Sequence, residues 1–106
     1  IVTRNHFRVG EAARRLAAAD PPAVASIEEH ARTFYGNGVY QMSQALYQAL
    51  VEISEDPATA YLNLGICSAA LGDPEVAREA FERFLELAPP DHPDLEMARE
   101  QLAALE

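Results

Sequence analysis

The residues of this 106-residue chain that could do chemistry are few and widely spaced. His6, His30 and His92 lie far apart, and none has a second histidine or a cysteine nearby at metal-ligand spacing. The sequence has no phosphate-binding glycine loop and no pattern of a nucleophile followed by its base. We therefore predict a protein without metal, cofactor or catalytic residues, and expect that it is not an enzyme.

The single cysteine and two acidic pairs each have a chemical and a structural explanation. Cys67 is either a buried small apolar residue or a reactive thiol. Because it is alone, it cannot close an internal disulfide, which fits a reducing compartment, and we expect a cytoplasmic location. The pairs Glu28-Glu29 and Glu55-Asp56 could act as paired carboxylates, but such pairs on a helix face or end are typical of a solvated surface.

The charge balance narrows the classes of partner. Eight basic residues, all arginine, stand against seventeen acidic ones, which gives a formal net charge of −9. Nucleic acid is excluded as an expected partner because its binding requires basic patches, and anionic membrane surfaces are disfavoured for the same reason. No apolar run approaches the roughly 18 to 20 residues that span a bilayer, so no membrane insertion is expected. The acidity either keeps the protein soluble or attracts a basic or amphipathic partner.

The elements that position these residues follow a repeat of 34 positions. Residues 24–57 and 58–91 align without a gap, and corresponding positions carry residues of the same type. The matched pairs are Gly38 and Gly72, Ala31 and Gly65, Ser43 and Ala77, Tyr47 and Phe81, and Ile53 and Leu87. This period is typical of helical hairpins, which bury their apolar faces only by stacking on one another.

The same register predicts the organisation of the whole chain as one all-α domain. Residues 1–23 would be the second helix of a degenerate preceding unit, and residues 92–106 a C-terminal capping helix, giving about six helices. Local signals agree in the second unit. Asp73 and Pro74 are suited to the N-cap and first position of a helix, and Gly72 to the turn before it.

Several residues of the second unit resemble the consensus of the tetratricopeptide repeat: Leu64, Gly65, Gly72, Ala77, Phe81, Leu87 and Pro89, with Tyr61 where the family usually has a large ring. The first unit is looser, since Ile27 replaces the ring, Ala31 the glycine and His30 a core leucine. His30 is then either a partly buried, hydrogen-bonded histidine or a pH-sensitive or ligand-binding one. The resemblance implies a right-handed superhelical stack of antiparallel hairpins whose function is to bind proteins.

Such a stack would place the first helix of each unit on an inner, concave side. Residues spaced by four and then three would face a common groove: Glu28, Arg32 and Tyr35, then Leu62, Ile66 and Ala69, then Glu96, Glu100 and Ala103. Asn63 joins them because an asparagine at this place in related repeats often bonds the backbone of an extended peptide, although asparagine is also common there in a structural role. The groove is expected to be apolar in its middle and acidic at its ends.

The resulting hypothesis is a protein-interaction module that holds an apolar or basic segment of a partner, either extended or as an amphipathic helix. Scaffold, assembly-factor and chaperone-like roles, such as those of small bacterial repeat proteins, are compatible with it. Arg32 is the one basic residue of the groove, which argues against repeats that clamp acidic chaperone tails.

Two alternatives remain open at the level of sequence. One is a self-associating scaffold, in which a homodimer forms through the apolar residues of the N-terminal helix: Val2, Phe7, Val9 and Leu16. The other is an accessory domain of a larger protein.

The repeat register also predicts which ring is central to the second hairpin. If Phe81 is a core residue, Phe81→Ala is expected to lower the free energy of unfolding by about 3–5 kcal/mol. Urea denaturation followed by circular dichroism measures this value, and an unchanged midpoint would contradict the register.

Overall fold

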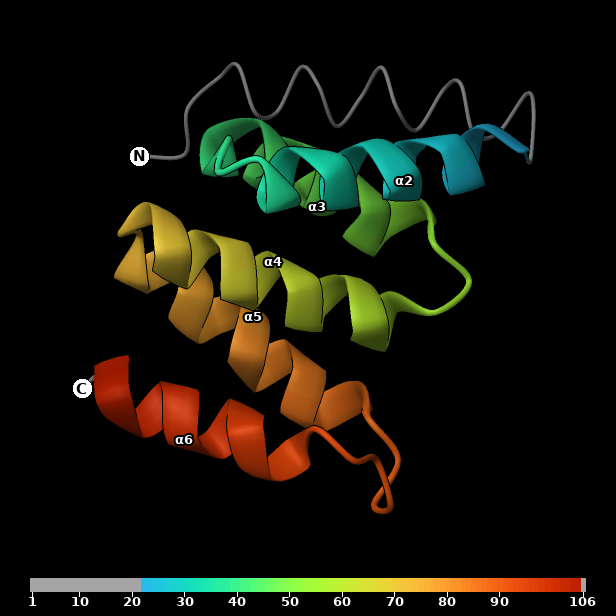
Figure 1. The fold of residues 1–106 in the computed structure, drawn as a ribbon. Coiled ribbons are helices and arrows are strands. Elements are labelled where there is room, and N and C mark those ends of the chain that lie inside the picture. Colours follow the sequence, from blue (N-terminus) through green and yellow to red (C-terminus); the bar gives the residue numbers. More distant parts are fainter. Residues whose placement is uncertain (1–21, 106) are drawn as a thin grey trace.

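The computed structural model describes residues 22–105, which form a stack of α-helices (Figure 1). The helices are α2 (Pro22–Gly36), α3 (Tyr40–Ile53), α4 (Pro57–Leu71), α5 (Pro74–Leu87) and α6 (Leu95–Leu105). Each packs against the next along the chain, and the described range contains no strand. The all-α, stacked-hairpin prediction is confirmed, with five helices over this range rather than about six. The predicted helix of residues 1–23, with its apolar residues, lies outside the described residues except for Pro22 and Ala23, which begin α2.

The two helices α4 and α5 begin with the same device. Asp56 and Asp73 are N-caps whose carboxylates accept hydrogen bonds at 3.3 Å from the backbone N–H groups of Thr59 and Val76. A proline follows each aspartate at the first turn, where a missing N–H costs no hydrogen bond. The N-cap and turn predictions for the second unit are therefore confirmed.

Glycines make the turn inside each hairpin. Gly38 and Gly72 have φ angles of 77° and 87°, a left-handed conformation that side chains with a Cβ adopt at a cost. This left-handed φ explains why both repeats carry glycine at the same position, 34 residues apart.

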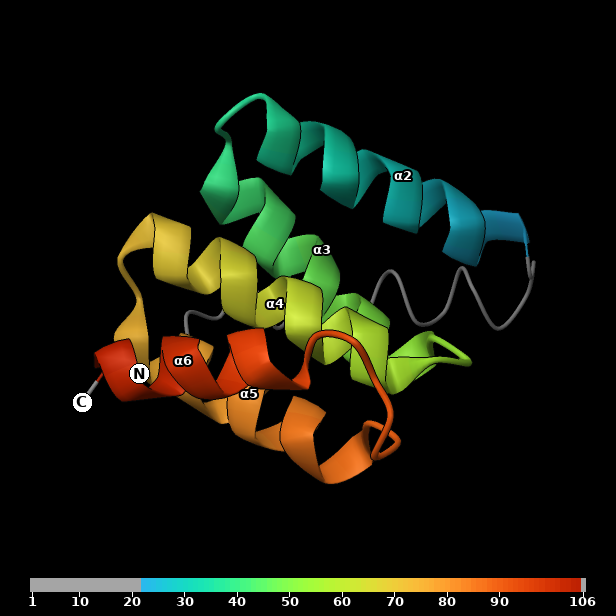
Figure 2. The same ribbon diagram turned by 60° about the horizontal axis from the view of Figure 1, so that its bottom comes forward.

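The stack has two layers. Helices α2, α4 and α6 lie on one side and α3 and α5 on the other, as the two ribbon views show (Figures 1 and 2). Helix α4 lies at the centre and has buried residues around its circumference, with no charged residue between Asp56 and Asp73. An all-round apolar helix of this kind is stable in water only when other helices cover it. No helix of the described range is both long and apolar enough to cross a membrane.

The core consists of two apolar clusters that meet at Tyr61. The first joins α2 to α5 around Tyr47, Leu50 and Leu64, and the second joins α4, α5 and α6 around Phe81. Phe81 has no exposed surface, as the repeat register predicted.

Gly65 lies in close contact with α5. A Cβ built on this glycine would lie 2.8 to 2.9 Å from three carbon atoms of the Phe81 ring, which is closer than such atoms approach in proteins. The Phe81 ring therefore explains why this position of the second repeat carries glycine.

Two neighbouring polar residues of α3 tie the helices together. The Ser43 hydroxyl donates to the carbonyl oxygen of Ala31 in α2 at 2.9 Å. The Gln44 side chain, fully buried, donates from Nε2 to Ser68 Oγ at 3.0 Å and to Asp73 Oδ2 at 3.1 Å. Gln44 thus links the first hairpin to both helices of the second.

The contact at Gly65 generates a stability prediction. Gly65→Ala is expected to lower the free energy of unfolding by about 1–3 kcal/mol, because the buried Phe81 ring must move to admit the methyl group. Gly36→Ala is the matched control, since a Cβ at Gly36 has no atom within 4 Å and its φ is not left-handed. The control is expected to leave stability unchanged or slightly raised. Equal urea midpoints for the two variants would contradict the close contact.

Candidate functional site

A pocket of about 400 Å³ opens between α2, α3 and α4. Its lining residues are Arg32 and Tyr35 from α2, Tyr47 from α3, and Asn63 and Ile66 from α4. We call it the tyrosine pocket. The structure thus brings together four residues of the predicted groove and adds Tyr47, which the sequence analysis did not include.

Tyr47 combines a buried ring with an unpaired hydroxyl. The residue is only 5% exposed and belongs to the core cluster between α2 and α5. Within residues 22–105 the Tyr47 hydroxyl has no hydrogen-bond partner. It is nevertheless not fully buried, since Gln44 Oε1 is the one fully buried side-chain oxygen or nitrogen in this range that lacks a partner. The Tyr47 hydroxyl must therefore reach the open space of the pocket. Burial raises the pKa of this hydroxyl, so it is a neutral hydrogen-bond donor at physiological pH.

The pocket walls carry further polar groups that nothing else in the described range engages. Arg32 is exposed and makes no ion pair there, and the half-buried Asn63 amide makes no hydrogen bond. Tyr35 is 39% exposed, and its ring contacts that of Tyr40 with 5.3 Å between centroids. Apolar walls with a few convergent polar groups are typical of ligand sites.

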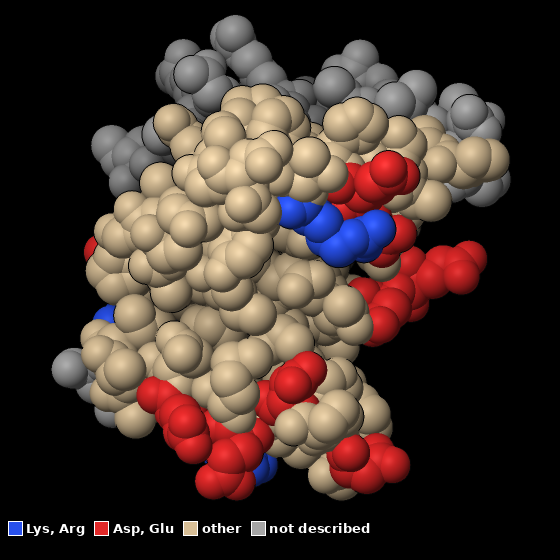
Figure 3. Space-filling view, in the orientation of Figure 1, with Lys and Arg blue, Asp and Glu red and all other residues tan. Residues whose placement is uncertain are grey.

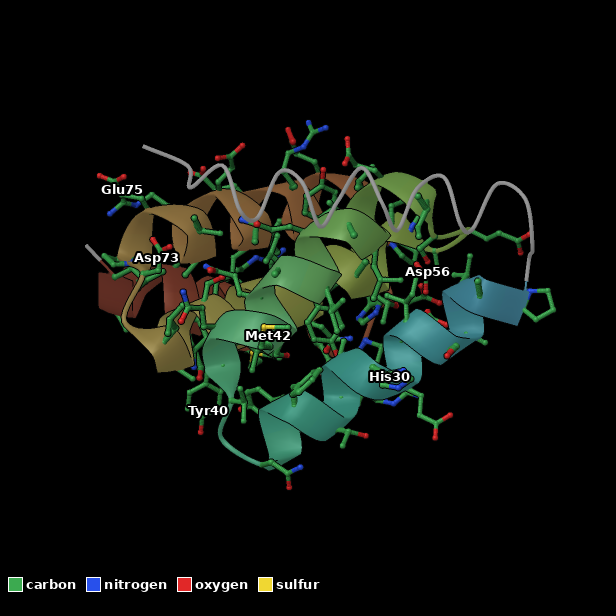
Figure 4. All side chains as sticks on the ribbon, turned by 90° about the horizontal axis from the view of Figure 1, so that it is seen from above. His30, Tyr40, Met42, Asp56, Asp73 and Glu75 are labelled. Carbon is green, nitrogen blue, oxygen red and sulfur yellow. The ribbon has the colours of Figure 1, made fainter. Side chains whose placement is uncertain are left out.

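A second pocket, of about 530 Å³, adjoins the first half of α2. Its lining residues are Val24, Ala25 and Glu28 from α2 and Ile53, Ser54, Glu55 and Asp56 from the end of α3 and the connection to α4. We call it the acidic pocket. Figure 4 shows Asp56 at this connection, beside the first half of α2. The predicted groove residue Glu28 therefore lines this pocket rather than the tyrosine pocket.

The tyrosine pocket and the acidic pocket carry charged side chains of opposite sign. Arg32 is the one Lys or Arg residue between Pro22 and Gly72, and Glu28 and Glu29 lie four and three residues before it on α2. In Figure 3 basic side-chain atoms lie beside α2 with acidic atoms above them and to their right. Arg32 therefore gives the tyrosine pocket a basic group, whereas Glu28, Glu55 and Asp56 line the acidic pocket.

Leu62 is a correction to the predicted groove. Its side chain is 6% exposed because it packs in the cluster that joins α4 to α5 and α6. Ala69, half-buried, packs against the same cluster. Glu96 and Glu100 lie exposed on α6 and line neither pocket described here, and Ala103 is likewise exposed.

His30 also differs from expectation in one respect. It is hydrogen-bonded, since Nδ1 lies 2.7 Å from the carbonyl oxygen of Ser26, but it is exposed rather than partly buried. In Figure 4 it lies on the outer side of α2. The described residues contain no group of three or more His, Cys, Asp or Glu side chains able to hold a metal ion.

Tyr47 was missed because it occupies the ring position of the repeat, where Phe81 stands in the second unit. The register correctly predicts a buried ring at both positions. The signal that could have identified it is the extra hydroxyl, because a tyrosine in a core position needs somewhere to place its polar end.

Comparison with known proteins supports the repeat. Residues 58–91 match the family model described as tetratricopeptide repeat, and these are the bounds predicted for the second unit. Neither the curated proteins nor the solved structures that were searched gave a significant match.

The surroundings of Cys67 do not favour thiol chemistry. It has no exposed surface, Sγ donates to the carbonyl oxygen of Leu64 at 3.4 Å, and burial raises its pKa from 9.0 to about 11. A raised pKa in the folded state favours the protonated thiol. The stability contributed by this group is therefore complete below about pH 9 and is lost as the pH rises toward about 11.

We expect Cys67 to be unreactive toward a thiol reagent such as 5,5′-dithiobis(2-nitrobenzoic acid) at pH 8 in the folded protein. The reagent should react fully in urea, because only unfolding exposes the sulfur and restores an ordinary pKa. Absorbance at the product wavelength measures the reaction. Rapid modification without denaturant would show that the thiol is accessible.

Proposed function

We propose that this protein binds other proteins through the groove between α2 and α4, because residues 58–91 match the tetratricopeptide repeat model, whose family is generally non-catalytic. The partner contributes a short segment, and the tyrosine pocket receives one of its side chains. The observation that carries this proposal is the assembly of the tyrosine pocket from three helices.

The volume and the walls of the pocket support this proposal. About 400 Å³ lies within the range of about 300–1,000 Å³ found for ligand sites. Tyr35, Tyr47 and Ile66 offer apolar surface, and tyrosine is a residue that interfaces favour because its ring loses little conformational freedom on binding.

An extended segment fits the groove better than a helical one. An extended chain has unpaired backbone N–H and C=O groups along its length, whereas those of a helix bond one another. The Asn63 amide has both a donor and an acceptor and makes no hydrogen bond within the described range. It is therefore suited to pair with the backbone of an extended partner.

The same surface gives no support to an enzymatic role. The buried thiol of Cys67 is sealed and protonated, and the ring of His30 is bonded to its own helix. The unpaired groups of the tyrosine pocket are donors that recognise rather than transform a ligand, so the function proposed is binding alone.

A random nine-residue peptide library displayed on phage tests this function with the full chain as the immobilised target. We expect enriched peptides whose synthetic versions shift the backbone NMR signals of Arg32, Tyr35 and Asn63. Tyr35→Ala should weaken their binding by about tenfold, as expected for an interface aromatic.

Leu87→Ala is the matched control, because Leu87 is also a partly exposed apolar residue but lies on α5, in the other layer. It should bind the peptides like the wild type. No enrichment, or signal shifts confined to α5 and α6, would contradict the proposed function.

A further inference from the structure

We propose that the groove selects partner segments in which one acidic and one basic side chain lie two residues apart. The acidic side chain enters the tyrosine pocket and the basic one faces the acidic pocket. This inference rests on the proposed function and adds the chemistry of the segment that is bound.

The tyrosine pocket has the composition of a carboxylate site. Arg32, the Tyr47 hydroxyl and the Asn63 amide all offer donors to it, and none has a partner among residues 22–105. Tyr47 is the decisive member, because its side chain is 95% buried while its hydroxyl is left to bond something in the pocket. Hydrogen bonds from a guanidinium and a neutral phenol to a carboxylate are charge-assisted and among the stronger ones in proteins.

The acidic pocket favours the opposite charge. Glu28, Glu55 and Asp56 line it, and Glu28 makes no ion pair within the described range. The aliphatic walls, Val24 and Ile53, suit the methylene stem of a lysine or arginine, whose charged end would then reach the carboxylates.

The spacing follows from the geometry of α2. Glu28 and Arg32 are four residues apart on one helix face, which places them about 6 Å apart along the axis. Side chains on one face of an extended segment recur every second residue, or about 7 Å. An acidic and a basic residue separated by one position therefore match the two pockets.

Other partner segments fit less well. A wholly apolar segment would leave the Tyr47 hydroxyl without a partner in a desolvated site, which is costly. A uniformly basic segment would place a cation against Arg32, and a uniformly acidic one would place a carboxylate against Glu28.

The test uses the same displayed peptide library on the full chain and on a charge exchange, Glu28→Arg with Arg32→Glu. The exchange keeps the net charge, so non-specific attraction is unchanged. We expect the wild type to enrich one order of the pair, acidic-x-basic or basic-x-acidic, and the exchanged protein to enrich the reverse order.

A synthetic peptide selected by the wild type is then measured directly, together with a second peptide in which its two charged residues are exchanged. The second peptide should bind the wild type about tenfold more weakly than the first, and should bind the exchanged protein as tightly as the first binds the wild type. The matched control exchanges Arg83 and Glu86, an exposed ion pair on α5 with 3.2 Å between Nη1 and Oε1. It should select the same peptides as the wild type.

Tyr47→Phe distinguishes recognition by the tyrosine pocket from attraction to surface charge, since it removes only the hydroxyl. It should weaken binding of the selected peptide several-fold, but not that of the same peptide with its acidic residue replaced by the neutral amide. Circular dichroism establishes that each variant is folded, and Arg32→Gln replaces the double exchange if that protein is unfolded. Arg32→Gln should lose the preference for an acidic residue.

The inference would be overturned if the enriched peptides map to the groove but have no charged pair at this spacing, or if the exchanged protein enriches the same order. Either result would leave the proposed function standing. Failure to enrich any peptide at the groove would overturn both.

Discussion

The stack depends on the contact between the Phe81 ring and the bare backbone of Gly65. The absence of a side chain at Gly65 lets the ring lie directly against α4, and Phe81 is then completely buried together with Phe84. Dense packing of this kind fixes the separation of the two helices, since a displacement of a fraction of an ångström loses contacts over the whole ring. Helix α4 in turn forms one wall of the groove, so the position of Asn63 and Ile66 follows from a contact on the opposite face of the helix.

The groove is a product of both layers. Helices α2 and α4 provide most of its walls, but Tyr47 reaches it from α3, in the other layer. The ring of Tyr47 fills the core, and its hydroxyl is turned toward the pocket, where the proposed partner side chain would lie. Helix α4 carries no charged residue, so no charge on this facing helix cancels those of Arg32 and Glu28.

Much of the fold could be predicted from sequence because the repeat fixes the local signals. The turn glycines and the ring positions recur 34 residues apart, and the aspartates Asp56 and Asp73 each precede a proline at a helix start, so each signal has a local physical cause. The site was predicted only in part. Leu62 has the correct spacing for the groove, but its exposure depends on where α6 packs, which no pattern within α4 records. His30 was expected to be partly buried because its repeat equivalent is, yet it lies at the edge of the described stack, where less surface is covered.

The link made by Gln44 has a consequence for how a ligand is received. Its two hydrogen bonds join α3 to Ser68 and Asp73, and both bonds are largely shielded from water. They oppose any hinge motion between the hairpins, so the distance from α2 to α4 is set before a partner arrives. A binding surface that is already rigid loses less entropy on association than one that must close around its ligand. Selectivity for the proposed partner segment would then be governed by its fit to a fixed template, which the buried amide of Gln44 helps to hold in place.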